Sequence, residues 1–142
     1  MVQRQYDLAR HPQMREIVRR AQRLLATGQV PVIVDGGGNV GMALRSFAAD
    51  YPFAHIVVIE PDLDNLRVAR ANAGEIDTPH TLVHAGLAAR AGHCRVTARE
   101  RGSAGLRTEY CCPADPEALC AITVPDAIAT VSGGAPWIVK LD

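Results

Sequence analysis

The chain has 142 residues, of which 48% are apolar, and its 15 basic and 15 acidic side chains leave no net charge. This length is enough for one globular domain with its own core. The neutral charge does not favour a nucleic-acid-binding protein, and no apolar run approaches the roughly 20 residues that cross a membrane. The N-terminus has no hydrophobic signal region, so we expect a cytoplasmic protein.

Residues 1–28 are predicted to form an N-terminal amphipathic helix that packs on the rest of the domain. Six arginines against two acids give this segment a net charge of +4. Apolar residues at helical spacing, such as Ala21 and Leu24, form the opposite face, and Gly28 is expected to end a helix placed at 12–27. We interpret the arginines as a solvated helix face, and the alternative is a basic interaction module.

An apolar strand then runs into a glycine-rich turn and a helix. Residues 31–35 are rich in β-branched residues, and residues 40–50 have helical spacing. Glycines allow the backbone to turn sharply and to approach a ligand closely. The following helix presents free N–H groups and a positive dipole to that ligand. The sequence therefore predicts a cofactor-binding turn, and its candidate binding residues are Asp35, Gly36, Gly37, Gly38, Asn39 and Gly41.

A second buried strand is predicted at 55–60, followed by a helix at 63–73. The strand ends in Glu60. Because the tips of adjacent parallel strands lie side by side, we expect Glu60 next to the glycine-rich turn. A carboxylate at this position can accept hydrogen bonds from both hydroxyl groups of a ribose.

Two cofactor classes fit this pattern. The spacing Gly36-x-Gly38-x-x-Gly41, with Glu60 about 20 residues further on, matches a dinucleotide fingerprint and favours the NAD(P)-binding domain of an oxidoreductase. Asp35 favours S-adenosylmethionine, because a carboxylate there repels a pyrophosphate but attracts a sulfonium and an ammonium group.

The rest of the chain continues the alternation of strands and helices. A third strand is predicted at 80–84, an antiparallel β insertion at 92–122, a helical turn at 125–131 and a last strand at 136–141. Residues 29–142 are therefore expected to form one α/β domain with a mostly parallel sheet and flanking helices.

The cysteines and histidines do not suggest a metal site. Cys94, Cys111, Cys112 and Cys120 include no C-x-x-C pair and no Cys/His pairing at zinc spacing, so we expect reduced thiols. His84, at the tip of the third strand, is either a strand-end residue or, by analogy with S-adenosylmethionine sites, a contact to adenine.

The motifs together resemble the FkbM-type methyltransferase family, which uses S-adenosylmethionine. The first two motifs resemble D-x-G-A-N-x-G and E-P-x-x-x-N of that family, and they are Asp35-x-Gly37-x-Asn39-x-Gly41 and Glu60-Pro61 with Asn65. Weaker matches follow in the same order at residues 82–87, 123–128 and 137–142. An alanine usually stands where this chain has Gly86. The resemblance adds Pro61, Ala85 and Gly86 to the candidate cofactor-binding residues.

The resemblance implies a Rossmann-like class I methyltransferase fold and O-methylation of a small hydroxylated acceptor such as a sugar or a polyketide. It makes Asp142, at the tip of the last strand, the candidate catalytic acid or base. The alternative is that Asp142 only caps a segment that follows it.

The family continues beyond the position of Asp142, so we expect a fold that is incomplete at its C-terminus and has little activity alone. A fragment or a non-catalytic cofactor-binding remnant is a further alternative. The strand at 136–141 would then leave Trp137, Ile138 and Val139 exposed on an open sheet edge, which favours pairing with a second copy of the chain.

Overall fold

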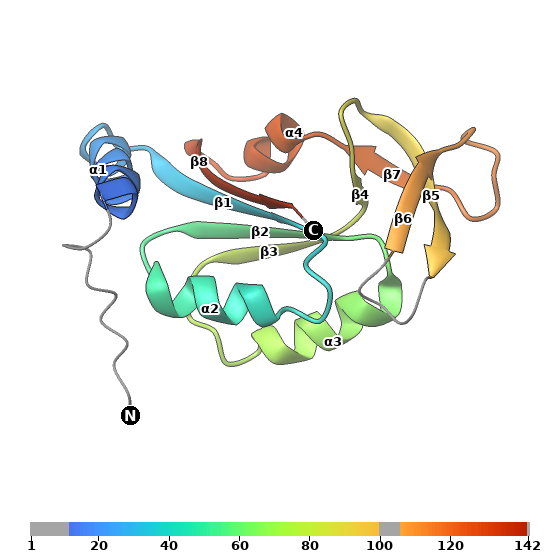
Figure 1. Ribbon diagram of the computed structural model, residues 1–142, viewed down its shortest axis with the longest axis horizontal. Helices are drawn as coiled ribbons and strands as arrows, with labels where there is room; N and C mark the ends of the chain where they lie inside the picture. Colours follow the sequence, from blue (N-terminus) through green and yellow to red (C-terminus); the bar gives the residue numbers. More distant parts are fainter. Residues whose placement is uncertain (1–11, 100–105, 142) are drawn as a thin grey trace.

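The structure is a computed structural model that describes residues 12–99 and 106–141 (Figure 1). In chain order its elements are α1 (Pro12–Ala26), β1 (Val30–Gly36), α2 (Met42–Asp50), β2 (His55–Glu60), α3 (Leu63–Ala73), β3 (His80–His84), β4 (Gly86–Leu87), β5 (Gly92–Arg99), β6 (Leu106–Tyr110), β7 (Leu119–Ile122), α4 (Val124–Ala129) and β8 (Gly134–Leu141). Within the described ranges, no helix is both long and apolar enough to span a membrane. The candidate catalytic residue Asp142 lies outside the described residues.

The larger sheet is parallel throughout and has the strand order β3-β2-β1-β8. Residues 32–34 and 56–59 of its central strands are fully buried, because both faces of the sheet are covered. Figure 1 shows α2 and α3 on one side of this sheet and α4 on the other, and each side has its own apolar core. The predicted α/β architecture with a mostly parallel sheet is confirmed.

Local signals set the ends of two helices. α1 ends where Gly28 adopts a φ of 76°, which lets the N–H of Gln29 donate to the carbonyl of Leu24 at 3.0 Å. Asp62 is the N-cap of α3, and its carboxylate accepts hydrogen bonds from two backbone N–H groups of the first turn. The helix predicted at 63–73 has these bounds in the structure.

The smaller sheet lies beyond the carboxyl ends of β1, β2 and β3 (Figure 1) and has the strand order β4-β7-β5-β6. β5 pairs antiparallel with both β6 and β7, which confirms the antiparallel strands predicted within 92–122. β4 pairs parallel with β7, so the sheet is mixed. The prediction missed this pair because β4 precedes residue 92 and has only two residues.

β8 lies at one edge of the larger sheet, but its side chains are less exposed than the sequence predicts. Val139 is 45% exposed, whereas Ile138 is half-buried and Trp137 is only 8% exposed. The prediction is therefore wrong for Trp137 and only partly right for Ile138. The indole N–H of Trp137 donates to the carbonyl of Ile17 in α1 at 2.8 Å, and two aromatic rings from the α2–β2 connection pack on it. Association of two copies through this edge stays a prediction.

Candidate functional site

The glycine-rich turn leaves the carboxyl end of β1 and lies against the carboxyl end of β2. The N–H groups of Gly37 and Gly38 donate to the carbonyl of Ile59 at 2.9 and 3.2 Å. Gly37 has a φ of 75°, in the left-handed region that favours glycine. This conformation turns the chain away from β1 and leads it to α2.

At four of the candidate glycines a Cβ would meet atoms of the protein itself. A Cβ on Gly36 would overlap the Leu87 side chain, and one on Gly86 would overlap the sulfur of Cys94. A Cβ on Gly38 would overlap Cγ1 of Val58 in β2, and a Cβ on Gly41 would come within 3.2 Å of Ala69 in α3. Close approach to a ligand and close approach to a neighbouring element both require glycine, so the sequence pattern does not separate these roles.

Glu60 lies beside the turn, where the sequence predicts it. Its Oε2 accepts a hydrogen bond from the backbone N–H of Asn39 at 2.7 Å, and its Oε1 accepts one from the N–H of Asp62 at 2.8 Å. The residue is only 2% exposed. Glu60 therefore joins the glycine-rich turn to the start of α3, a structural role that the sequence does not reveal.

Asp35 is fully buried at the end of β1 and forms an ion pair with Lys140 of β8. The distance from Lys140 Nζ to Asp35 Oδ1 is 2.8 Å. Lys140 neutralises the negative charge of Asp35, and this charge is the feature of the sequence that favours S-adenosylmethionine over a dinucleotide. The repulsion of a pyrophosphate by Asp35 is therefore weaker than the sequence alone suggests.

A cavity of about 440 Å³, here called the glycine cavity, lies at the carboxyl ends of β1 and β8. Its lining residues are Gly36, Gly37, Pro61, Gly86, Leu87, Ala88, Ala89, Thr108, Val124 and Leu141. Four predicted cofactor residues are among them, from the ends of three different strands. The other described candidates do not line it: Asn39 is half-buried, and the buried ones are Asp35, Gly38, Gly41, Glu60 and Ala85.

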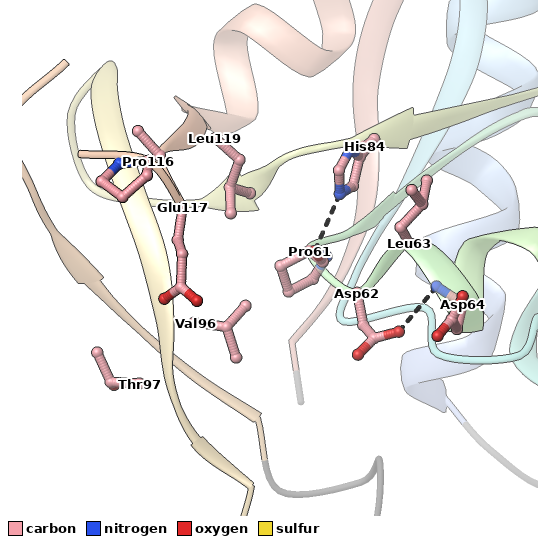
Figure 2. A pocket seen from close by; sticks show the side chains of 11 residues that line it. Pro61, Asp62, Leu63, Asp64, His84, Val96, Thr97, Pro116, Glu117 and Leu119 are labelled. Atoms are coloured by element: carbon pink, nitrogen blue, oxygen red, sulfur yellow. Dashed lines mark hydrogen bonds between the residues drawn. The ribbon is translucent and has the colours of Figure 1, made fainter. Parts of the chain in front are cut away.

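A second cavity of about 680 Å³, here called the acidic cleft, separates the start of α3 from the smaller sheet (Figure 2). Its lining residues are Pro61, Asp62, Leu63, Asp64, His84, Val96, Thr97, Pro116, Glu117, Ala118 and Leu119. In the part of the chain that the structure describes, this lining includes three carboxylates and no lysine or arginine. His84 contacts the carbonyl of Pro61 through Nε2 at 3.1 Å, and Pro61 also lines the glycine cavity.

The smaller sheet supplies one wall of the acidic cleft, and the sequence analysis missed these residues. Val96, Glu117 and Leu119 belong to no recognisable motif, and only the pairing of β5 with β7 brings them opposite Pro61. Their order in the chain gives no signal for this position, because it depends on how two sheets pack together.

Neither comparison with known proteins nor a search for metal ligands among the described residues assigns a function to this site. No family model, curated protein or solved structure matches this chain. Among the described residues, no group of three His, Cys, Asp or Glu side chains is arranged to hold a metal ion, and the four cysteines are free. Burial raises the pKa of the Cys94 thiol, which opposes formation of a reactive thiolate.

Proposed function

We propose that this chain is an S-adenosylmethionine-dependent methyltransferase domain with a Rossmann-like class I fold, similar to the FkbM-type enzymes. The glycine cavity carries the proposal, since residues selected by motif at three strand ends line a single cavity. It lies where β8 and β2 flank β1 on opposite sides, and open parallel sheets bind ligands at such a reversal of strand order. Its volume falls in the range of small-molecule sites.

The residues at this edge suit the parts of the cofactor. Gly36 and Gly37 line the glycine cavity, and we assign the methionine part to the backbone of this turn. Glu60 is our candidate for the ribose hydroxyls. A carboxylate has about four acceptor positions, and two backbone N–H groups and the side-chain amide of Asn65 use three of them, so one remains for a hydroxyl. When bound, S-adenosylmethionine supplies an electrophilic methyl group.

The acceptor is proposed to be a small hydroxylated molecule, such as a sugar or a polyketide, on the basis of the motif resemblance. Catalysis then requires the acceptor oxygen to be held in line with the methyl group, so positioning provides most of the rate. A base that takes the hydroxyl proton adds to it, and Asp142 is our candidate for that base.

An NAD(P)-binding domain is the second candidate, and the Asp35–Lys140 ion pair favours it by removing a charge that would repel a pyrophosphate. The acidic cleft favours the first candidate. Among the residues that the structure describes, Asp62, Asp64 and Glu117 line it and no lysine or arginine does, so the field of this described lining disfavours a dianionic pyrophosphate and favours a cofactor with a sulfonium and an ammonium group.

Calorimetric titration of the purified chain with S-adenosylmethionine, S-adenosylhomocysteine and NAD, side by side, tests the proposal. We expect both sulfur compounds to bind and NAD not to bind. Binding of NAD alone would establish the second candidate in place of the first.

A valine at Gly37 tests whether the ligand lies at the turn. A side chain at a φ of 75° costs about 1–2 kcal/mol, and Gly37 lines the cavity, so Gly37→Val should abolish binding in a folded protein. Gly28→Val is the matched control, because Gly28 has a φ of 76° and open space around it at the end of α1. Unchanged affinity in Gly37→Val would show that the turn has only a structural role.

A further inference from the structure

The side chain of Glu117 is exposed and lines the acidic cleft. Glu117 belongs to the connection between β6 and β7. Figure 2 shows its carboxylate projecting into the cleft beside Val96, on the opposite side from Pro61 and Asp62. Within the part of the chain that the structure describes, this carboxylate takes part in no hydrogen bond or ion pair.

The backbone that carries Glu117 is nevertheless held in place. The N–H of Glu117 donates to Oδ1 of Asp115 at 2.9 Å, and Oδ2 of Asp115 accepts a hydrogen bond from Arg95 of β5 at 2.9 Å. Arg95 also donates to Glu109 of β6 through two nitrogens. This network fixes the loop against the smaller sheet and leaves the Glu117 carboxylate available to a ligand.

The other two carboxylates of the cleft are already engaged. Asp62 caps α3 by accepting hydrogen bonds from two backbone N–H groups. Asp64 forms an ion pair with Arg67, one turn further along the same helix, at 2.9 Å. Glu117 is therefore the carboxylate of this cleft with the most acceptor capacity for a bound molecule.

Both walls of the cleft carry apolar side chains as well as polar ones. Val96 and Leu119 come from the smaller sheet, and Pro61 and Leu63 come from the other wall of the cleft (Figure 2). A flat ring with apolar faces and a hydrogen-bond donor on its edge matches such a site. Because Pro61 lines both cavities, a ligand that lies across Pro61 reaches from the glycine cavity into the acidic cleft.

We propose that the acidic cleft binds the adenine of the cofactor and that Glu117 accepts a hydrogen bond from its exocyclic amino group. This inference rests on the proposed function, and it makes Glu117 a specificity-determining residue supplied by the smaller sheet. A hydrogen bond to a carboxylate is about twice as strong as one between neutral groups. Glu117 thus selects a purine that carries an amino group over one that lacks it.

The experiment compares two ligands on three proteins by calorimetric titration. The ligands are S-adenosylhomocysteine and its analogue whose purine lacks the 6-amino group. The proteins are the native chain, Glu117→Ala and the control Glu75→Ala, which removes an exposed glutamate that lines neither cavity. Glu117 is also exposed, so both variants should fold, and circular dichroism checks this.

We expect the native chain and Glu75→Ala to bind S-adenosylhomocysteine about 10- to 100-fold more tightly than the analogue, the range expected for a hydrogen bond to a charged group. In Glu117→Ala this preference should disappear, with the affinity for the analogue unchanged. If S-adenosylhomocysteine binds but Glu117→Ala keeps the native preference, the inference is wrong and the proposed function stands. If the native chain binds neither ligand, the proposed function fails, and the inference fails with it.

Discussion

At the scale of single residues, Glu60 connects the candidate binding site to the stability of the fold. Its two oxygens satisfy backbone N–H groups of the glycine-rich turn and of the first turn of α3. A buried N–H group that loses its partner carries the full cost of its desolvation. The conformation of both segments therefore depends on one carboxylate.

We expect Glu60→Ala to lower the free energy of unfolding by about 2–4 kcal/mol, because it leaves two N–H groups without their acceptor. Urea denaturation measures this loss. The exposed Glu75→Ala serves as the reference and should change stability by less than about 0.5 kcal/mol. Equal stabilities of the two variants would contradict the structural role of Glu60.

The position of Glu60 could be predicted from the sequence, but its hydrogen bonds could not. Alternating strands and helices bring the tips of adjacent strands together, and this places Glu60 beside Gly37 whatever the details of the turn. Which N–H groups point at the carboxylate depends on backbone angles at Asn39 and Asp62. Those angles are set by packing between elements, which a local pattern does not encode.

At the scale of elements, β2 and β3 are joined by a side-chain contact as well as by their backbone pairing. Nε2 of His55 lies 2.8 Å from the hydroxyl oxygen of Thr81. Burial lowers the pKa of His55 below its usual value of 6.5, and the neighbouring His80 lowers it further. The folded protein therefore holds His55 in its neutral form more strongly than the unfolded chain does.

Because the pKa of His55 is lower in the folded state, the unfolded chain binds this proton first as the pH falls below 6.5. The contribution of neutral His55 to the free energy of unfolding is fully present above pH 6.5. It is lost as the pH falls through the pKa that His55 has in the folded state. We expect His55→Gln to lose less stability than the native chain between pH 7.5 and pH 5.5, measured by urea denaturation. Thr81→Val keeps the imidazole and should retain the native pH dependence, whereas a flat profile in the native chain would contradict the assignment.

The elements that the sequence predicts best are those with local signals. The strand at 55–60 and the helix at 63–73 are marked by a run of β-branched residues, an aspartate cap and helical spacing, and both have the predicted bounds. The parallel pairing of β4 with β7 and the placement of the smaller sheet across the acidic cleft from α3 have no such signal. They involve residues that are far apart in the chain, so the wall of the acidic cleft that the smaller sheet supplies could not be foreseen.

At the scale of the whole molecule, the first and last described elements hold each other. α1 covers Trp137 of β8, and the hydrogen bond from Trp137 to Ile17 joins residues 120 positions apart. Trp137 also contacts the rings of Tyr51 and Phe53, which come from the connection between α2 and β2. Trp137 therefore connects β8 both with α1 and with the connection between α2 and β2.

Replacing this side chain tests how much the arrangement contributes. Trp137→Ala should lower the free energy of unfolding by about 3–5 kcal/mol, the usual cost of removing a large buried aromatic ring. Trp137→Phe keeps most of the apolar contact and loses the hydrogen bond, so a smaller loss of about 1–2 kcal/mol is expected. Denaturation curves give both values, and Val139→Ala in the exposed part of the same strand should cost less than either. A loss below about 1 kcal/mol in Trp137→Ala would show that α1 is not held by this contact.

The placement of β8 beside β1 has a consequence for biosynthesis. β8 begins 98 residues after β1 ends, so at roughly 5–20 residues per second the ribosome makes β1 about 5–20 seconds before its partner strand exists. During that time the edge of β1 that later pairs with β8 has no partner in the nascent chain, and it can associate with other chains. The last residues of β8 also bring Lys140 to the buried Asp35. The synthesis of β8 therefore covers the open edge of β1 and also supplies the lysine that neutralises Asp35. Slow translation of this final segment should increase the dependence of this protein on chaperones.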